Sequence, residues 1–317
     1  MMAAPRMPHG RYAPSPTGLL HLGSARTALV AWLSARAARG RFSLRIEDID
    51  RPREVPGMAQ AIVNDLAWLG LDWDDAPVRQ SERHVHYEAA LDQLQRRGRL
   101  FPCRYSRRDL EQIATAPHGN ERVTRYPASL RPTDLPSNWY ASFRKTTGDA
   151  ALRFMVAPGV VTFDDHVFGA TTEDVASTVG DFVVWRRDGI WAYQFAVVVD
   201  DLLTGITEVV RGADLLDSTA RQILLFQALG GVVPTYTHVP LVVNGDGQKL
   251  SKRDKALSVA ALRDAGVDAE TVVGVLGASL RLLPEVRRCK PEALIARFDW
   301  KRIPREPWRL SCWPQRL

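Results

Sequence analysis

Strand, loop and helix patterns alternate along the first part of the chain. Residues 21–39 are rich in Ala, Leu and Arg, which favours a helix, and Gly40 follows at a position typical of a helix end. Residues 42–46 alternate like a strand, and residues 58–69 have the spacing of an amphipathic helix. This rhythm is typical of a parallel sheet with crossover helices, so we expect an α/β fold.

The pattern changes in the middle of the 317-residue chain. A stretch rich in Pro, Arg, Ser and Thr suggests an insertion, and two apolar runs around Asp188-Gly189, at 181–185 and 190–199, predict a β-hairpin. The sequence from residue 250 onward predicts mainly helices. We therefore expect four parts. These are the first half of a catalytic domain at 8–100, an inserted subdomain at 101–180, the second catalytic half at 181–245, and a helical C-terminal domain at 246–317.

Composition excludes several classes of protein. No apolar run approaches the ~18 residues of a membrane helix, and the N-terminus lacks the apolar core of a secretory signal. Three widely spaced cysteines imply no disulfide framework, so we expect a cytoplasmic protein. The net charge of +6 permits a polyanionic partner without requiring one.

A proline-rich loop at 14–18 leads into the first helix. The start of a helix presents unpaired N–H groups and a partial positive charge, which suit a phosphate. His21 can add a donor, and Gly23, with no side chain, lets a flat base approach the backbone. The competing interpretation is a stiff turn in which Ser or Thr caps the helix.

The lysines are distributed unevenly. Only six of the 42 basic residues are lysines, and three of these six lie within residues 249–255. Lys249 and Lys252 follow a glycine-rich turn at 244–247, from which mobile cations can reach a polyphosphate. The alternative is an ordinary solvated basic loop.

Four dispersed residues lie near the ends of apparent strands, where open α/β sheets bind ligands. Together they would suit an acidic amino acid. The two arginines can pair with its carboxylates, and the glutamate can bind its ammonium group, with a tyrosine beside them. Ordinary surface ion pairs are the alternative. The four residues are Arg11, Glu47, Tyr193 and Arg211.

Taken in order, these motifs resemble the class I aminoacyl-tRNA synthetases. HLGS at 21–24 resembles the first signature of that class, "HIGH", and KLSKR at 249–253 resembles the second, "KMSKS". RYAPSPTG at 11–18, LRIEDID at 44–50 and RGADLL at 211–216 are similar to the glutamyl branch. The resemblance implies a Rossmann-like nucleotide-binding catalytic domain with an inserted α/β subdomain and a short helical C-terminal domain.

Only 64 residues follow Arg253, so we expect no anticodon-binding domain. The chain thus resembles the truncated glutamyl-Q tRNA(Asp) synthetases, and it also shares their sequence motifs at residues 52–57, 106–110 and 298–305. That family activates L-glutamate with ATP without needing tRNA. It then attaches glutamate to the queuosine base in the anticodon loop of tRNA(Asp). We expect a monomer with no membrane partner.

The resemblance also implies a role for each matching residue. Magnesium is expected to accompany ATP. Glutamate would be held by Arg11, Ser15, Glu47, Tyr193 and Arg211; ATP would be held by Ser15, His21, Gly23 and Lys252; catalysis would use His21, Lys249 and Lys252.

The family often carries a zinc site in its insertion, and this chain departs from it. Cys103 remains and Tyr126 matches, but Tyr105 and Leu130 stand where cysteines are expected. A closed structural site needs four ligands, so we expect no zinc. Two other functions stay open. One is a truncated discriminating glutamyl-tRNA synthetase, and the other is a non-catalytic paralogue that binds tRNA or a metabolite.

Overall fold

Parallel strands form the centre of the protein. The computed structural model describes residues 7–106, 109–110, 125–145, 148–250 and 255–310. The central strands are β1 (His9–Tyr12), β2 (Arg41–Ile46), β3 (Val78–Arg79), β9 (Glu208–Gly212) and β10 (Thr235–Val239). β2 pairs in parallel with both β1 and β3, and β9 pairs in parallel with β10. The backbone N–H of Thr207 donates to the carbonyl oxygen of His9 at 3.0 Å, which joins the two sets. The expected α/β fold is confirmed.

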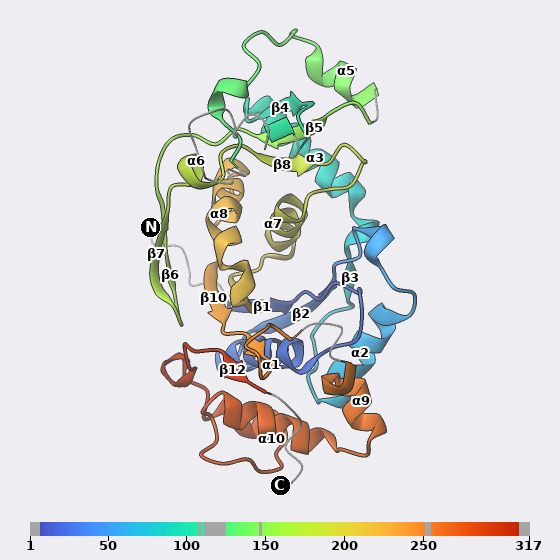
Figure 1. Ribbon diagram of the computed structural model, residues 1–317, viewed down its shortest axis with the longest axis vertical. Coiled ribbons are helices and arrows are strands. Elements are labelled where there is room, and N and C mark those ends of the chain that lie inside the picture. Colours follow the sequence, from blue (N-terminus) through green and yellow to red (C-terminus); the bar gives the residue numbers. More distant parts are fainter. Residues whose placement is uncertain (1–6, 107–108, 111–124, 146–147, 251–254, 311–317) are drawn as a thin grey trace.

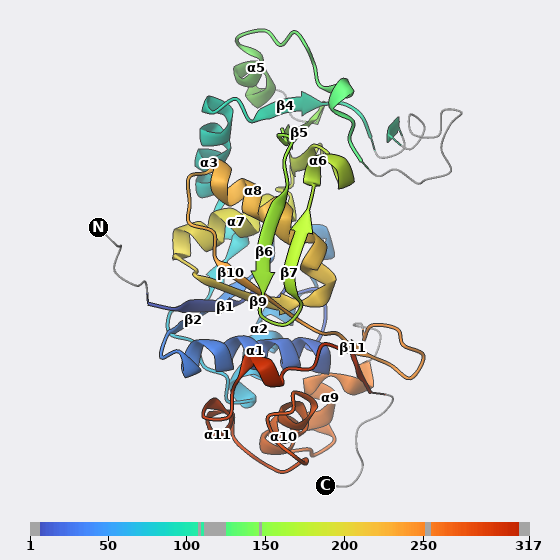
Figure 2. The same cartoon turned by 90° about the vertical axis from the view of Figure 1, so that its left-hand side faces the viewer.

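Helices cover both faces of these strands (Figure 1 and Figure 2). One face is covered by α1 (Leu22–Ala37) and α2 (Met58–Trp68), and the other by α7 (Tyr193–Thr204) and α8 (Thr219–Ala228). Leu29 of α1 packs in one apolar core, and Phe195 of α7 packs in the other. Burial of two such faces provides most of the apolar stabilisation and fixes the carboxyl ends of the strands between the helices.

The predicted hairpin is only partly correct. A turn follows β8 (Phe182–Trp185), and the backbone N–H of Arg186 donates to Ile190 O at 2.9 Å. The returning segment makes one bridge at Trp191 and then becomes α7, whereas a strand was predicted over 190–199. A short apolar run cannot distinguish a buried strand from a buried helix, because neither shows a polar face. Gly205 at φ 71° then ends this helix.

A second sheet lies above α7 and α8. It consists of β4 (Leu100–Cys103), β5 (Ala151–Phe154) and β8, all antiparallel, and nearby helices are α3 (His84–Arg96), α5 (Trp139–Lys145) and α6 (Val175–Thr178). A hairpin of β6 (Val161–Asp165) and β7 (Gly169–Glu173) runs from this region down to the central strands (Figure 2). There β6 meets β10 where Asp165 pairs with Tyr236.

The C-terminal segment packs below α1. It contains α9 (Val259–Asp264), α10 (Ala269–Ser279), α11 (Glu292–Ile295) and β12 (Trp308–Arg309), which pairs with β11 (Val242–Val243). The sequence predicts one strand over 239–243, but Pro240 has no N–H and separates β10 from β11. Pro240 instead accepts a hydrogen bond at 2.8 Å from the buried Arg26 of α1. Among the described residues, no helix is long and apolar enough to cross a membrane.

Candidate active site

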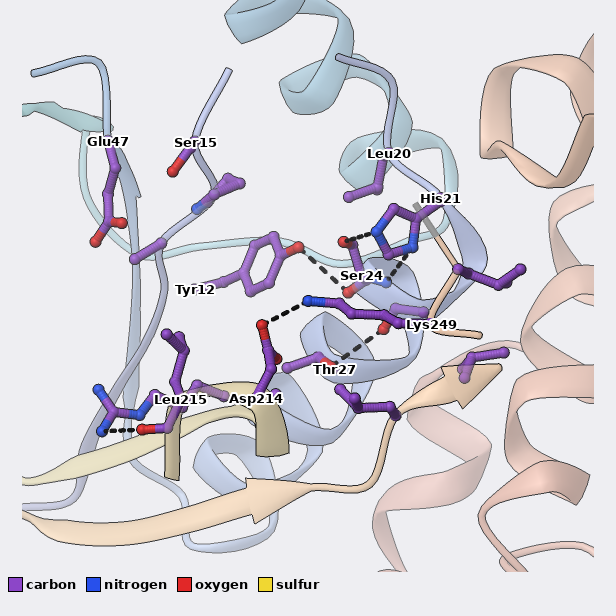
Figure 3. A pocket seen from close by; sticks show the side chains of 18 of the residues that line it. Tyr12, Ser15, Leu20, His21, Ser24, Thr27, Glu47, Asp214, Leu215 and Lys249 are labelled. Atoms are coloured by element: carbon purple, nitrogen blue, oxygen red, sulfur yellow. Dashed lines mark hydrogen bonds and ion pairs between the residues drawn. The ribbon is translucent and has the colours of Figure 1, made fainter. Parts of the chain in front are cut away.

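A cavity of about 300 Å³ opens where β1 and β9 end, beside the first turn of α1. Most of the residues that the motifs predict lie around it: Arg11, Ser15, His21, Gly23, Glu47, Tyr193, Arg211 and Lys249. Figure 3 shows Glu47 and Ser15 at one side of this cavity and His21, Ser24 and Lys249 at the other. Lys252 lies outside the described residues. Motifs separated by more than two hundred residues therefore meet in one cavity.

Arg11 is held in place by an acid that the motifs do not include. Its Nε donates to Oδ1 of Asp201 at 3.2 Å, and its Nη1 donates to Val210 O at 3.3 Å. Arg45 donates to the same Asp201 Oδ1 at 2.6 Å. Burial disfavours the charged form of Asp201, but the two arginines outweigh burial and lower the pKa of this carboxyl. Asp201 is thus a buried anion that orients two cations.

Glu47 follows β2 directly, and its backbone N–H donates to Pro14 O at 2.9 Å. Its carboxylate accepts from Arg45 Nη2 at 3.2 Å. Burial raises the pKa of Glu47 above its usual value, although Arg45 and Arg11 oppose the change. Burial and the nearby Glu47 also raise the pKa of Tyr193, so its phenol stays protonated at neutral pH. The cavity wall therefore combines a carboxylate acceptor with a phenol donor.

Arg211 lies in β9 and is almost fully enclosed by neutral acceptors. Its Nε donates to His238 Nε2 at 3.0 Å, and its Nη1 donates to Gln222 Oε1 at 2.6 Å. Its Nη2 donates to Thr219 Oγ1 at 2.8 Å and to Leu215 O at 3.2 Å. No carboxylate pairs with this guanidinium among the described ion pairs. A buried cation without a paired anion is well suited to bind an anionic ligand.

His21 caps the first helix. Its Nδ1 accepts a hydrogen bond from the backbone N–H of Ser24 at 3.1 Å, and its Nε2 lies 3.1 Å from Ser24 Oγ (Figure 3). A Cβ on Gly23 would lie 3.1 Å from two atoms of this ring and 3.4 Å from Val242 Cβ. Space at Gly23 is therefore needed for the ring to keep this position.

Lys249 extends into the cavity from the segment after β11. Its Nζ pairs with Asp214, which follows β9 and also lines the cavity (Figure 3). The side chain of Lys249 remains 47% exposed. Because exposed ion pairs contribute little to stability, this lysine can leave Asp214 for a more highly charged ligand at small cost.

Three residues that support the site were not predicted from the motifs, namely Arg45, Asp200 and Asp201. Arg45 lies inside the LRIEDID motif but bonds to Asp201, and the adjacent Asp200 accepts from Gln80, Arg83 and Tyr87 at 2.6–2.8 Å. The sequence does indicate that Asp200 and Asp201 have partners. Two acids in the middle of an apolar helix must be paired when they are buried, and Asp200 and Asp201 are at most 1% exposed.

The region around Cys103 does not fit a zinc ion. The thiol is buried and accepts from Arg153 Nε at 3.2 Å, and the Arg153 guanidinium lies 4.3 Å from the centre of the Tyr126 ring. A guanidinium beside the sulfur repels a divalent cation, so Cys103 and Tyr126 pack with Arg153 instead. The described residues hold no group of three or more potential metal ligands. The absence of zinc stays a prediction.

Comparison with known proteins agrees with the motifs. A family model for class I tRNA synthetases (E and Q), catalytic domain, matches residues 9–304. A glutamyl-Q tRNA(Asp) synthetase from Symbiobacterium thermophilum is 49% identical, over 96% of each chain. A glutamyl-Q tRNA(Asp) synthetase from Nocardia farcinica is 47% identical, over 95% of this chain and 93% of that one.

Solved structures agree as well. A glutamate tRNA ligase from Elizabethkingia meningosepticum, crystallised with its amino acid, superposes with a TM-score of 0.82 at 28% identity. The match covers 96% of this chain and 67% of that chain.

Proposed function

Because this chain belongs to the glutamyl-Q tRNA(Asp) synthetases within the class I tRNA synthetase family, we propose that it activates L-glutamate with ATP and transfers the glutamate to the queuosine base in the anticodon loop of tRNA(Asp). One observation carries the activation step. A single cavity combines the residues suited to an acidic amino acid with a capped helix start and a half-exposed lysine. The names of the relatives support the acceptor.

Glutamate binding follows from the charges of the cavity. Glu47 accepts the ammonium group, and the guanidinium groups of Arg11 and Arg211 take the two carboxylates of the substrate. Ser15 and Tyr193 add hydroxyl donors beside them. Asp201 already compensates Arg11, whereas no acid in the described part of the chain pairs with Arg211, so the substrate anion gains most at Arg211.

ATP binding uses the other side of the cavity. His21 and the N–H groups at the start of α1 line the cavity on the side proposed for the phosphates, and the adenosine is proposed to lie against Gly23 on the same side. Magnesium would enter with ATP, because Mg²⁺ usually keeps several waters and is held by substrate phosphates together with one or two carboxylates. An oxygen of the glutamate α-carboxylate attacks the α-phosphorus, the new P–O bond forms, and pyrophosphate leaves. Lys249, together with Lys252, neutralises the departing charge.

Pyrophosphate exchange tests the activation step. We expect exchange of labelled pyrophosphate into ATP that depends on glutamate and needs no tRNA. The Lys249→Ala variant is expected to lower kcat by about a hundredfold, because it removes a charge that stabilises the leaving group. Lys301→Ala changes an exposed lysine that does not line the cavity and is the matched control. Full exchange by Lys249→Ala contradicts its role, and exchange with an amino acid other than glutamate contradicts the proposal.

We also propose that the protein is cytoplasmic and monomeric. All substrates of the reaction are present in the cytoplasm, where three separate cysteines stay reduced. We propose a monomer, because the described residues assigned to glutamate and ATP already meet in one cavity of a single chain.

A further inference from the structure

We propose that Asp165 and His238 position Arg211 to bind a carboxylate of glutamate. This role rests on the proposed function and gives the β6–β7 hairpin a part in the active site. Neither residue lines the cavity. Both act through Arg211 and are therefore positioning residues.

The direction of each hydrogen bond defines the state of the His238 ring. The Nε atom of an arginine can only donate, so His238 Nε2, at 3.0 Å from Arg211 Nε, must accept and carries no proton. Burial lowers the pKa of His238, so the ring is neutral at pH 7 and its proton is on Nδ1. That N–H donates to Asp165 Oδ2 at 2.7 Å. Asp165 thus selects the tautomer that can hold Arg211.

Asp165 is itself fixed at the tip of the hairpin. Its Oδ1 accepts from the backbone N–H groups of Val167 and Phe168 at 2.9 and 2.8 Å. Its Oδ2 accepts from the backbone N–H of His238 at 2.9 Å as well as from the ring. Burial of the carboxyl acts to raise its pKa, but these hydrogen bonds outweigh burial and lower the pKa of Asp165. The carboxyl is therefore charged at neutral pH. A charged, fully bonded carboxylate is a rigid acceptor for the ring.

The hydrogen bonds of Arg211 leave one of its N–H groups for a ligand. A guanidinium has five N–H groups. Those of Arg211 go to His238, Gln222, Thr219 and Leu215, which accounts for four of the five. The remaining N–H is on Nη1, and Arg211 lines the cavity. Loss of the His238 acceptor would let the guanidinium rotate and redirect this donor away from the substrate.

An Asp165→Asn substitution should reverse the tautomer. The new amide nitrogen faces either the two turn N–H groups or the one backbone N–H of His238. The second orientation opposes fewer donors, and there the amide nitrogen donates to Nδ1 of the ring. The ring proton then moves to Nε2 and faces the Arg211 Nε–H, donor against donor. A similar exchange of a carboxylate for an amide in the Ser-His-Asp triad also produces the wrong tautomer.

The first arm of the test is the ¹⁵N NMR spectrum of histidine-labelled wild-type chain at pH 7.5. We expect His238, assigned by its loss in His238→Gln, to be protonated at Nδ1, and to be protonated at Nε2 in Asp165→Asn. A wild-type His238 that is charged or protonated at Nε2 overturns the proposal.

The second arm is glutamate-dependent pyrophosphate exchange. Asp165→Asn is expected to raise the KM for glutamate about ten- to a hundredfold, the usual effect of one hydrogen bond to a charged group, with the KM for ATP unchanged. Asp164→Asn makes the same chemical change at an exposed neighbour and is the matched control. A folded Asp165→Asn variant with a normal KM for glutamate, or with both KM values raised equally, overturns the proposal.

A double-variant cycle separates positioning from simple support of the hairpin. In His238→Gln, the amide oxygen can still accept from Arg211 Nε but no longer depends on Asp165. Adding Asp165→Asn to His238→Gln should therefore change the KM for glutamate by less than about twofold. A full additional loss would mean that Asp165 acts only by folding the hairpin.

The two proposals fail in different ways. A wild-type chain without glutamate-dependent exchange contradicts the proposed function and with it the role in glutamate binding, while the NMR arm still reports whether Asp165 and His238 hold Arg211. Normal wild-type exchange with no effect of Asp165→Asn contradicts only the positioning role.

Discussion

At the scale of single residues, Glu47 lies in surroundings that disfavour the state it needs. Its proposed role, to hold an ammonium group, needs a charged carboxylate, yet burial raises its pKa despite Arg45 and Arg11. A folded-state pKa above the unfolded value means that the protonated form is favoured by folding. At pH values above the folded pKa, the ionised carboxylate therefore reduces the free energy of unfolding.

A Glu47→Gln variant is accordingly expected to separate stability from activity. The amide keeps an oxygen for Arg45 but cannot neutralise an ammonium, so the KM for glutamate should rise about tenfold or more. The Tm at pH 7.5 should be equal to that of the wild type or higher. Thermal unfolding and pyrophosphate exchange measure the two effects. Glu82→Gln, an exposed glutamate, is the control, and a Glu47→Gln variant with normal glutamate KM would contradict the assignment.

The residues that line the cavity could be predicted because they stand in motifs near strand ends. Their supporting partners could not. Arg45 and Asp201 are separated by 156 residues in the chain, and Arg11 and Asp201 by 190. Neither periodicity nor local spacing indicates which buried acid will meet which arginine. Only the folded arrangement of β1, β2 and α7 decides it.

At the scale of elements, α7 shows where sequence patterns mislead. Its apolar run has the β-branched residues of a strand, but tertiary burial allows a helix, and the N-terminus of that helix places Tyr193 at the cavity. The first helix was easier to predict, because its composition and the glycine after it agree. In the structure Arg39, at φ 51°, takes the left-handed position, and Gly40 is needed because a Cβ there would lie 2.3 Å from Pro8 O.

A Gly23→Ala variant tests the start of α1. The added methyl group would lie 3.1 Å from the His21 ring and is expected to displace it, since Val242 limits movement on the other side. We expect the KM for ATP to rise about tenfold, with the KM for glutamate unchanged. Gly10→Ala in β1 adds the same group at ordinary contact distances of 3.4 Å or more and is the control. Equal effects of the two variants in exchange assays would argue against a specific role for Gly23.

At the scale of the whole molecule, the segment between the two sets of central strands is tied to the rest at several points. Asp165 at the tip of the β6–β7 hairpin bonds to His238 in β10, and His166 stacks on Trp300 of the C-terminal segment with 5.4 Å between ring centres. Composition predicted an insertion here. It could not predict these contacts, because they join residues far apart in the chain.

Metal analysis tests how this region is stabilised. Because the Arg153 guanidinium occupies the surroundings of Cys103, we expect less than about 0.1 zinc per chain and no change in Tm with a chelator. An Arg153→Ala variant should lower the Tm without gaining zinc. Stoichiometric zinc in the purified protein, measured by elemental analysis, would contradict this account of the insertion.

The most direct test of the central claim is the site of glutamate attachment. Purified protein, ATP and labelled glutamate would be incubated with tRNA that contains queuosine and with tRNA from cells unable to make it. We predict label only on the queuosine-containing tRNA, in its anticodon loop. Label on the 3′ end regardless of queuosine would contradict the proposed acceptor and indicate a charging enzyme. No label together with no pyrophosphate exchange would contradict the proposed activity altogether.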